Sequence, residues 1–107
     1  MMADANQRLR GMLGFAMRAG KLVIGSESVL NAVSSKKPPE LVIVASGVSE
    51  GTKKKLTTKC EFYEIKLVQI NIGADELGDL LGKTYSPATI CVMDKGFARE
   101  IEKLTFG

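Results

Sequence analysis

The longest uninterrupted apolar run in the chain is Leu41-Val42-Ile43-Val44-Ala45. A strand with one buried face alternates apolar and polar residues, whereas this run is apolar at every position. It therefore predicts a central strand that other parts of the chain cover on both faces. Pro38 and Pro39 come shortly before it and end the helix expected upstream, because proline cannot continue a helix.

Helices and strands are expected to alternate on both sides of this run. Short apolar segments predict three more strands, at residues 22–24, 68–72 and 89–93. Helical spacing predicts five helices: one from a capping pair of Asp4 and Gln7 to Gly20, one after Gly25, one from near Ser49 towards Tyr63, one over 75–81, and one carrying Phe97, Ile101 and Leu104. The order αβαβαβαβα indicates one domain over residues 1–107, a three-layer α/β/α sandwich with a four-stranded mixed sheet.

The charge of the chain is small but unevenly distributed. The 107 residues carry a net charge of +3, with 45% hydrophobic and 25% charged residues, as in ordinary globular domains. Residues 1–59 hold ten basic and four acidic side chains, whereas residues 60–107 hold five and eight. This split predicts one basic surface, for which phosphate is the commonest partner. A chance scatter of solvated charges explains the charge pattern equally well.

Residue types exclude several classes of function. The chain has no histidine, which removes histidine-based triads, general bases and metal ligands. Cys60 and Cys91 form no CxxC pair and are expected to be small buried hydrophobes with reduced thiols. A phosphate loop is also excluded, because Gly78 and Gly82 are separated by three residues and fall within and at the end of a helix. We therefore expect no enzyme, cofactor or metal.

No segment predicts a membrane span or a signal-peptide core, because the longest apolar run is far shorter than the ~20 residues that a span requires. Together with reduced cysteines, this predicts a cytoplasmic protein with no membrane partner.

Two short segments suggest contacts with an anion. Lys53, Lys54 and Lys55 fall at or near the start of the third helix, where cations oppose the helix dipole by ~0.3–1 kcal/mol each. They are either tolerated on a solvated face or meet phosphate, and we favour phosphate. Lys36 and Lys37 sit at a helix C-terminus and are expected to be structural. The turn Gly25–Ser28 opens the second helix with free backbone N–H groups and a glycine that permits close approach.

The segment Leu13–Gly25 resembles the opening block of the bacterial YlxQ-like proteins. These belong to the superfamily of ribosomal proteins, of the seven-Ae and thirty-e types, that bind kink-turn RNA. The resemblance covers essentially the whole chain. Its other matches are Leu41–Ser46, Ser49, Thr52–Lys55, Glu76–Gly78, Gly82 and Phe97-Ala98.

This resemblance implies an α/β/α sandwich that binds RNA at one end of its sheet. In RNA-binding relatives the second helix begins with Gly-x-Asn-Glu-x-x-Lys, whose Asn and Glu read sheared G·A pairs and whose Lys meets phosphate. Gly25 matches this motif, whereas Glu27, Ser28 and Asn31 stand where relatives have Asn, Glu and Lys. A carboxylate at position 27 cannot donate a hydrogen bond and repels phosphate.

The resemblance also implies a contact from the loop before the last strand, here Lys83–Thr89. In relatives a corresponding loop closes over a protruding nucleotide. Tyr85 offers a face on which a base could stack, for ~1–3 kcal/mol per base. Tyr85 could equally be a surface residue that packs on Pro87.

These expectations combine into one interpretation: a monomeric, non-enzymatic protein that binds structured, kink-turn-like RNA, associates with the ribosome, and has no small-molecule substrate. The alternative is a protein-interaction module on the same scaffold, which Glu27 and Ser28 favour and the basic N-terminal half opposes. The predicted RNA-contacting residues are Lys21, Gly25, Ser26, Glu27, Ser28, Asn31, Lys53, Lys54, Lys55, Tyr85, Ser86 and Pro87.

Overall fold

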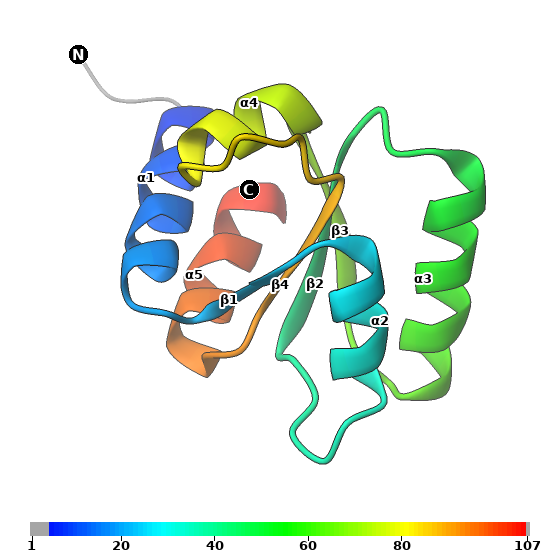
Figure 1. Cartoon of the computed structure of the whole chain (residues 1–107). Helices are drawn as coiled ribbons and strands as arrows, with labels where there is room; N and C mark the ends of the chain where they lie inside the picture. The colour runs from blue at the N-terminus through cyan, green and yellow to red at the C-terminus, as the bar shows by residue number, and fades with distance from the viewer. Residues whose placement is uncertain (1–4, 107) are drawn as a thin grey trace.

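In the computed structural model, which describes residues 5–106, helices and strands alternate as the sequence predicts (Figure 1). The helices are α1 (Ala5–Arg18), α2 (Ser26–Val33), α3 (Glu50–Phe62), α4 (Ala74–Leu80) and α5 (Lys95–Phe106). The strands are β1 (Leu22–Ile24), β2 (Leu41–Ser46), β3 (Leu67–Gly73) and β4 (Thr89–Val92). Asp4, expected to form a capping pair with Gln7, lies outside the described residues.

The four strands form one mixed sheet in the order β1-β4-β2-β3. β2 pairs with β3 in parallel and with β4 antiparallel, and β4 also pairs antiparallel with β1. β2 therefore has a neighbour on each side, which confirms the central strand predicted from the run Leu41–Ala45. All five of those residues are buried.

Helices cover both faces of the sheet, so the three-layer sandwich is confirmed (Figure 1). Side chains of β2 alternate between two separate cores, because successive residues of a strand point to opposite faces. Leu41, Ile43 and Ala45 join the core formed with α1, α4 and α5. Val42 and Val44 join the core formed with α2 and α3.

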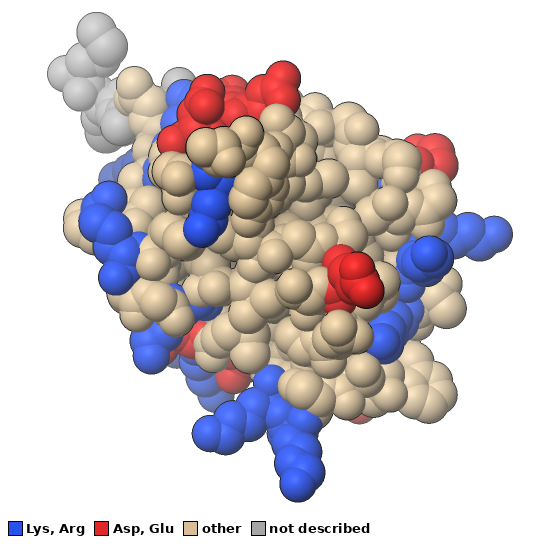
Figure 2. Space-filling view, viewed as in Figure 1, with Lys and Arg blue, Asp and Glu red and all other residues tan. Residues whose placement is uncertain are grey.

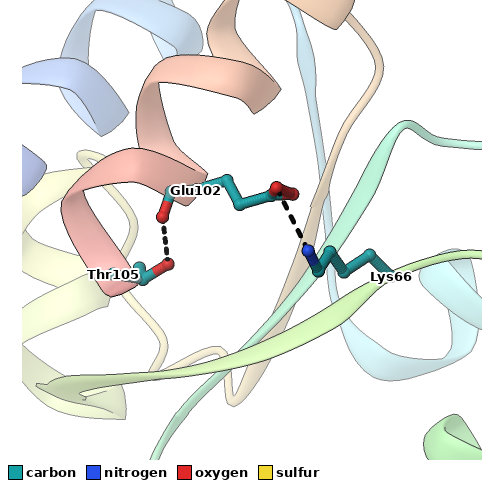
Figure 3. Close-up of polar contacts among 3 residues, drawn as sticks. All are labelled: Lys66, Glu102 and Thr105. Carbon is teal, nitrogen blue, oxygen red and sulfur yellow. Dashed lines mark hydrogen bonds and ion pairs between the residues drawn. The ribbon is translucent and has the colours of Figure 1, made fainter. Parts of the chain in front are cut away.

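The C-terminal helix is attached to the edge strand by a polar contact (Figure 3). Glu102 of α5 accepts a hydrogen bond from Lys66, the residue before β3, with the Lys66 Nζ and Glu102 Oε2 atoms 3.3 Å apart. The hydroxyl of Thr105 donates to the backbone carbonyl of Glu102 over 2.9 Å. Both side chains of the ion pair are partly exposed, so this contact contributes little to stability, within ~0–1 kcal/mol.

Two groups of lysines lie at different positions relative to their helices than the sequence predicts. α2 ends at Val33 with Ser34 as its C-cap, so Lys36 and Lys37 lie beyond the helix rather than at its C-terminus. In α3, Ser49 is the N-cap and its hydroxyl accepts from the Thr52 N–H over 3.2 Å. The lysines that follow Thr52 therefore begin in the second turn of α3, where the helix dipole opposes them less.

Candidate nucleic-acid interface

One end of the sheet gathers most of the predicted contact residues. β1, β2 and β3 end there and β4 begins there, because β4 runs antiparallel to its neighbours. The first turn of α2, the start of α3, and the loop of residues 81–88 between α4 and β4 meet at this end (Figure 1). Gly25–Ser28 and the loop that carries Tyr85–Pro87 therefore lie at the same end of the sheet although they are distant in sequence.

Thr89 joins the two segments. Its backbone carbonyl accepts a hydrogen bond from the Gly25 N–H over 2.9 Å, and its hydroxyl oxygen accepts from the Ser26 hydroxyl over 2.9 Å. Thr89 is fully buried, and it is the one polar residue in the buried set among the described residues. The Ala88 carbonyl also accepts from the Ala45 N–H over 2.8 Å. The base of the loop is thus fixed to both β1–α2 and the central strand.

The loop between α4 and β4 rests on Gly78, a role that the sequence did not reveal. A Cβ at this position would collide with the Tyr85 carbonyl oxygen and would lie 3.2 Å from Cδ of Pro87. The Ser86 hydroxyl donates a short hydrogen bond to a carboxylate oxygen of Asp75. The loop is therefore seated on the helix that precedes it. The one sequence signal for this was a glycine inside a helix, where alanine would be the better helix former.

Tyr85 of this loop has an exposed side chain. Its exposed fraction is 54%, whereas Pro87 is buried. An exposed aromatic ring is able to stack on another planar group. The stacking of a base on Tyr85 stays a prediction.

The first turn of α2 lacks a side-chain cap. Gly25 occupies the N-cap position with φ 106°, a backbone conformation in which glycine is favoured, and it offers no side-chain oxygen to the first N–H groups. Glu27, Ser28 and Asn31 all have exposed side chains on this helix. Glu27 offsets the positive end of the helix dipole, so it has a structural role as well as the predicted position in the interface.

The three consecutive lysines of α3 point in different directions, because successive helical residues are ~100° apart around the axis. Lys53 is half-buried and its Nζ donates to Oε1 of Gln69 in β3 over 2.8 Å. Lys54 and Lys55 are exposed. The three lysines therefore do not form a single cationic group, and Lys54 and Lys55 are the two with exposed side chains.

Lys21 lies at the opposite end of β1 from the other predicted contacts. Its carbonyl accepts from the Met93 N–H over 2.8 Å, just beyond the last residue of β4. The length of β1 separates it from Gly25. The nearby basic residues of α1 make contacts within the protein: Arg10 forms an ion pair with Glu76 of α4, and the Arg18 guanidinium lies 4.9 Å from the centre of the Phe15 ring.

The single basic surface expected from the charge split is not seen on the face in Figure 2. Lys and Arg lie mostly around the edge of this face, along α3 and below α2, while the centre is tan apart from an acidic patch to the right of the middle. Acidic side chains gather over α4, which carries Asp75, Glu76 and Asp79. The basic residues of the N-terminal half are dispersed because α1 covers one face of the sheet, α3 covers the other, and Lys36 and Lys37 lie in the connection after α2.

Both cysteines are buried, as the sequence predicts. Burial raises the pKa of the Cys60 thiol, and burial raises the pKa of Cys91 to about 12. Neither thiol is suited to act as a nucleophile, which requires the thiolate. Within residues 5–106, we find no group of three or more potential metal ligands. In the same range, no helix is both long enough and apolar enough to cross a membrane.

Comparison with known sequences gives one matching family and several relatives. The ribosomal protein L7Ae/L30e/S12e/Gadd45 family matches residues 7–102. The RNA-binding protein YlxQ of Enterococcus faecium is 34% identical over 101 residues, covering 94% of each chain. The large ribosomal subunit protein eL30 of Sulfurisphaera tokodaii is 34% identical over 91 residues, covering 85% of each chain.

Solved structures show the same fold. A protein of unknown function from Bacillus halodurans C is 35% identical with a TM-score of 0.84, over 92% of this chain and 97% of that chain. The Giardia lamblia 15.5kD RNA binding protein has a TM-score of 0.74 at 16% identity, over 99% of this chain and 88% of that chain. At that identity the second likeness concerns the fold alone.

Proposed function

This chain belongs to the ribosomal protein L7Ae/L30e/S12e/Gadd45 family, and we propose that it is a non-enzymatic protein that binds structured RNA. The proposed interface is the end of the sheet where the first turn of α2 meets the loop between α4 and β4. Relatives named as an RNA-binding protein and as a ribosomal protein support an RNA partner.

The connection through Thr89 is the observation that carries this proposal. Two hydrogen bonds of 2.9 Å tie Gly25 and Ser26, at the uncapped start of α2, to Thr89, which directly follows the loop that carries the exposed Tyr85. Backbone N–H groups at a helix start suit phosphate or base-edge acceptors, and an exposed ring suits an unpaired base. A kink in an RNA helix presents phosphate or base-edge acceptors and an unpaired base together, because an unpaired nucleotide lies beside a distorted backbone.

The chain's own residues imply a changed mode of base recognition. The Glu27 carboxylate only accepts hydrogen bonds, so it would pair with a base amino group and disfavour a base carbonyl. The Ser28 hydroxyl both donates and accepts but reaches less far than the glutamate of relatives. We therefore propose kink-turn-like RNA as the target class, bound with fewer side-chain contacts to G·A pairs than in relatives with the full motif.

Binding to three RNAs at two salt concentrations tests this function. The RNAs are a kink-turn, the same RNA with its G·A pairs replaced, and a plain duplex. We expect the kink-turn to bind most tightly at both salt concentrations. Equal and steeply salt-dependent binding to all three would reduce the function to nonspecific phosphate binding. Absence of binding to all three would contradict the proposal and support a protein-interaction module.

Glu27 provides a sharper version of the same test. Glu27→Gln removes a negative charge from the proposed interface, so we expect tighter kink-turn binding than in the unmodified protein. Glu40→Gln is the matched control, because Glu40 is exposed at the opposite end of the sheet, where its N–H donates to Val92. If both variants changed affinity equally, only the net charge of the chain would matter. If neither did, Glu27 would lie outside the interface.

We also propose that the protein acts in the cytoplasm as a monomer and in association with the ribosome. The buried free thiols of Cys60 and Cys91 are consistent with a reducing compartment. The likeness to ribosomal relatives supports the ribosomal setting. Sedimentation of the tagged protein with ribosomal subunits from gently lysed cells tests that setting, and a protein found only in the light fractions would contradict it.

A further inference from the structure

The outer face of α3 carries an open groove that extends well beyond the end of the sheet where the proposed interface lies. The groove has a volume of about 510 Å³ and runs along most of the helix. All of its lining residues belong to α3 or directly follow it. Its lining residues are Gly51, Lys54, Lys55, Thr58, Lys59, Phe62 and Tyr63.

Two exposed aromatic rings close one end of the groove. Phe62, the last residue of α3, is 79% exposed, and the C-cap Tyr63 is 44% exposed. Their ring centres are 5.0 Å apart at an angle of 69°, the edge-to-face arrangement in which aromatic rings attract one another. The two rings therefore contact each other while both remain exposed to solvent.

Three lysines line the same groove. Within residues 5–106, none of the ion pairs found joins Lys54, Lys55 or Lys59 to a carboxylate. Lys55 and Lys59 are four residues apart on one helix, where like charges repel by ~0.2–0.5 kcal/mol. Figure 2 shows basic side chains along α3, at the right of the view. The groove thus combines unpaired positive charge with exposed rings.

We propose that this groove binds a single-stranded segment of nucleic acid that flanks the structured RNA. The lysines would neutralise phosphates while Phe62 and Tyr63 stack on bases. A paired helix cannot supply such bases, because its bases are stacked on one another. This inference rests on the proposed RNA-binding function, since α3 begins at the end of the sheet where the structured RNA would bind.

The length of the helix sets the size of the segment. α3 has 13 residues and is therefore about 20 Å long, from the proposed interface to the aromatic pair. A strand that leaves the structured RNA near Gly51 would follow the lysines and reach Phe62 and Tyr63 after a few nucleotides. An acidic protein segment is the competing occupant, but it would satisfy the lysines without needing two exposed rings.

The first test compares a kink-turn RNA with the same RNA carrying a single-stranded extension at one end or the other. We expect one extension to tighten binding about tenfold, since stacking one base contributes ~1–3 kcal/mol. Phe62→Ala and Lys59→Gln should remove that gain and leave binding to the RNA without extension unchanged. Phe15→Ala is the matched control, because Phe15 is also exposed, at 59%, but lies on α1. An extension without effect, or a gain that survives Phe62→Ala, would overturn the inference.

Tyrosine fluorescence separates this inference from the proposed function. The chain has two tyrosines and no tryptophan, so Tyr85→Phe leaves Tyr63 as the single reporter and Tyr63→Phe leaves Tyr85. A short pyrimidine oligonucleotide should quench Tyr63 and have little effect on Tyr85. If the oligonucleotide quenches Tyr63 but the protein does not bind the kink-turn, the proposed function is refuted and the proposal that the groove binds single-stranded nucleic acid stands. Quenching of Tyr85 alone, or displacement of the oligonucleotide by equimolar polyglutamate, would refute the groove.

Discussion

The carbonyl of Tyr85 lies directly against the α-carbon of Gly78, in the space where any other residue would place its Cβ. The loop that carries the exposed tyrosine therefore depends on a residue without a side chain in the helix before it. This contact couples the shape of the proposed interface to a buried position of α4.

Gly78→Ala is expected to weaken RNA binding while preserving the fold. The new methyl group must push the Tyr85 carbonyl and Pro87 outwards, which moves the loop that faces the RNA. Gly11→Ala is the control, because a Cβ there meets no atom within 4 Å and alanine favours a helix by ~1 kcal/mol. Chemical denaturation and RNA titration of both variants measure the effect. Tight RNA binding by Gly78→Ala would mean that the position of the loop is unimportant.

Thr89→Val is expected to lower the free energy of unfolding by about 1–2 kcal/mol, since a hydroxyl of Ser26 loses its partner at nearly constant side-chain volume. Urea denaturation should show a lower midpoint with an unchanged m-value. Ser26→Ala completes a double-mutant cycle, and the double variant should lose less than the sum of the two single losses. Simple additivity would show that the 2.9 Å contact contributes nothing to stability.

Lys54→Ala with Lys55→Ala is expected to reduce the salt dependence of RNA binding. Each lost phosphate contact lowers the slope of log K against log salt by about 0.9 on a duplex and ~0.7 on a single strand. Lys36→Ala with Lys37→Ala removes the same charge from the connection after α2 and should leave the slope unchanged. Equal changes in both double variants would show that net charge alone governs binding. Titrations over a range of salt concentrations measure both slopes.

The stability of the protein is expected to fall at high pH because of Cys91. Burial raises the pKa of this thiol from 9.0 to about 12, so the folded chain keeps a proton that the unfolded chain releases. The contribution is complete below pH 9 and decreases between pH 9 and about 12, with a slope of about 1.4 kcal/mol per pH unit. The difference in unfolding free energy between the unmodified protein and Cys91→Ala, measured across this range, isolates the effect. A constant difference would contradict it.

Local patterns were sufficient for the fold. The buried run Leu41–Ala45, the helical spacing of apolar residues and the glycines at helix ends all act within a few residues, so they can be seen in one sequence. The half-buried position of the Lys53 side chain could not be predicted in this way, because its partner Gln69 lies on β3, 16 residues further along the chain. For the same reason, the sequence did not show that the Lys53 side chain is half-buried while those of Lys54 and Lys55 are exposed.

The same limit applies to the interface. The sequence identified Gly25 and Tyr85 as separate candidates, one in a turn and the other in a loop. It did not identify Thr89 or Gly78, because a buried threonine and a helical glycine look ordinary until the segments that contact them are known. Whether Lys21 takes part stays a prediction, since it lies at the other end of β1 from these residues.

The sequence by itself determined the order of elements, the covered central strand and the resemblance to an RNA-binding family, because each depends on residues that are close along the chain. Only the tertiary structure decided which segments share one end of the sheet, which lysines face solvent, and where the exposed rings lie. Those features depend on contacts between residues far apart in sequence, such as Ser26 with Thr89, and on the layer into which each helix folds.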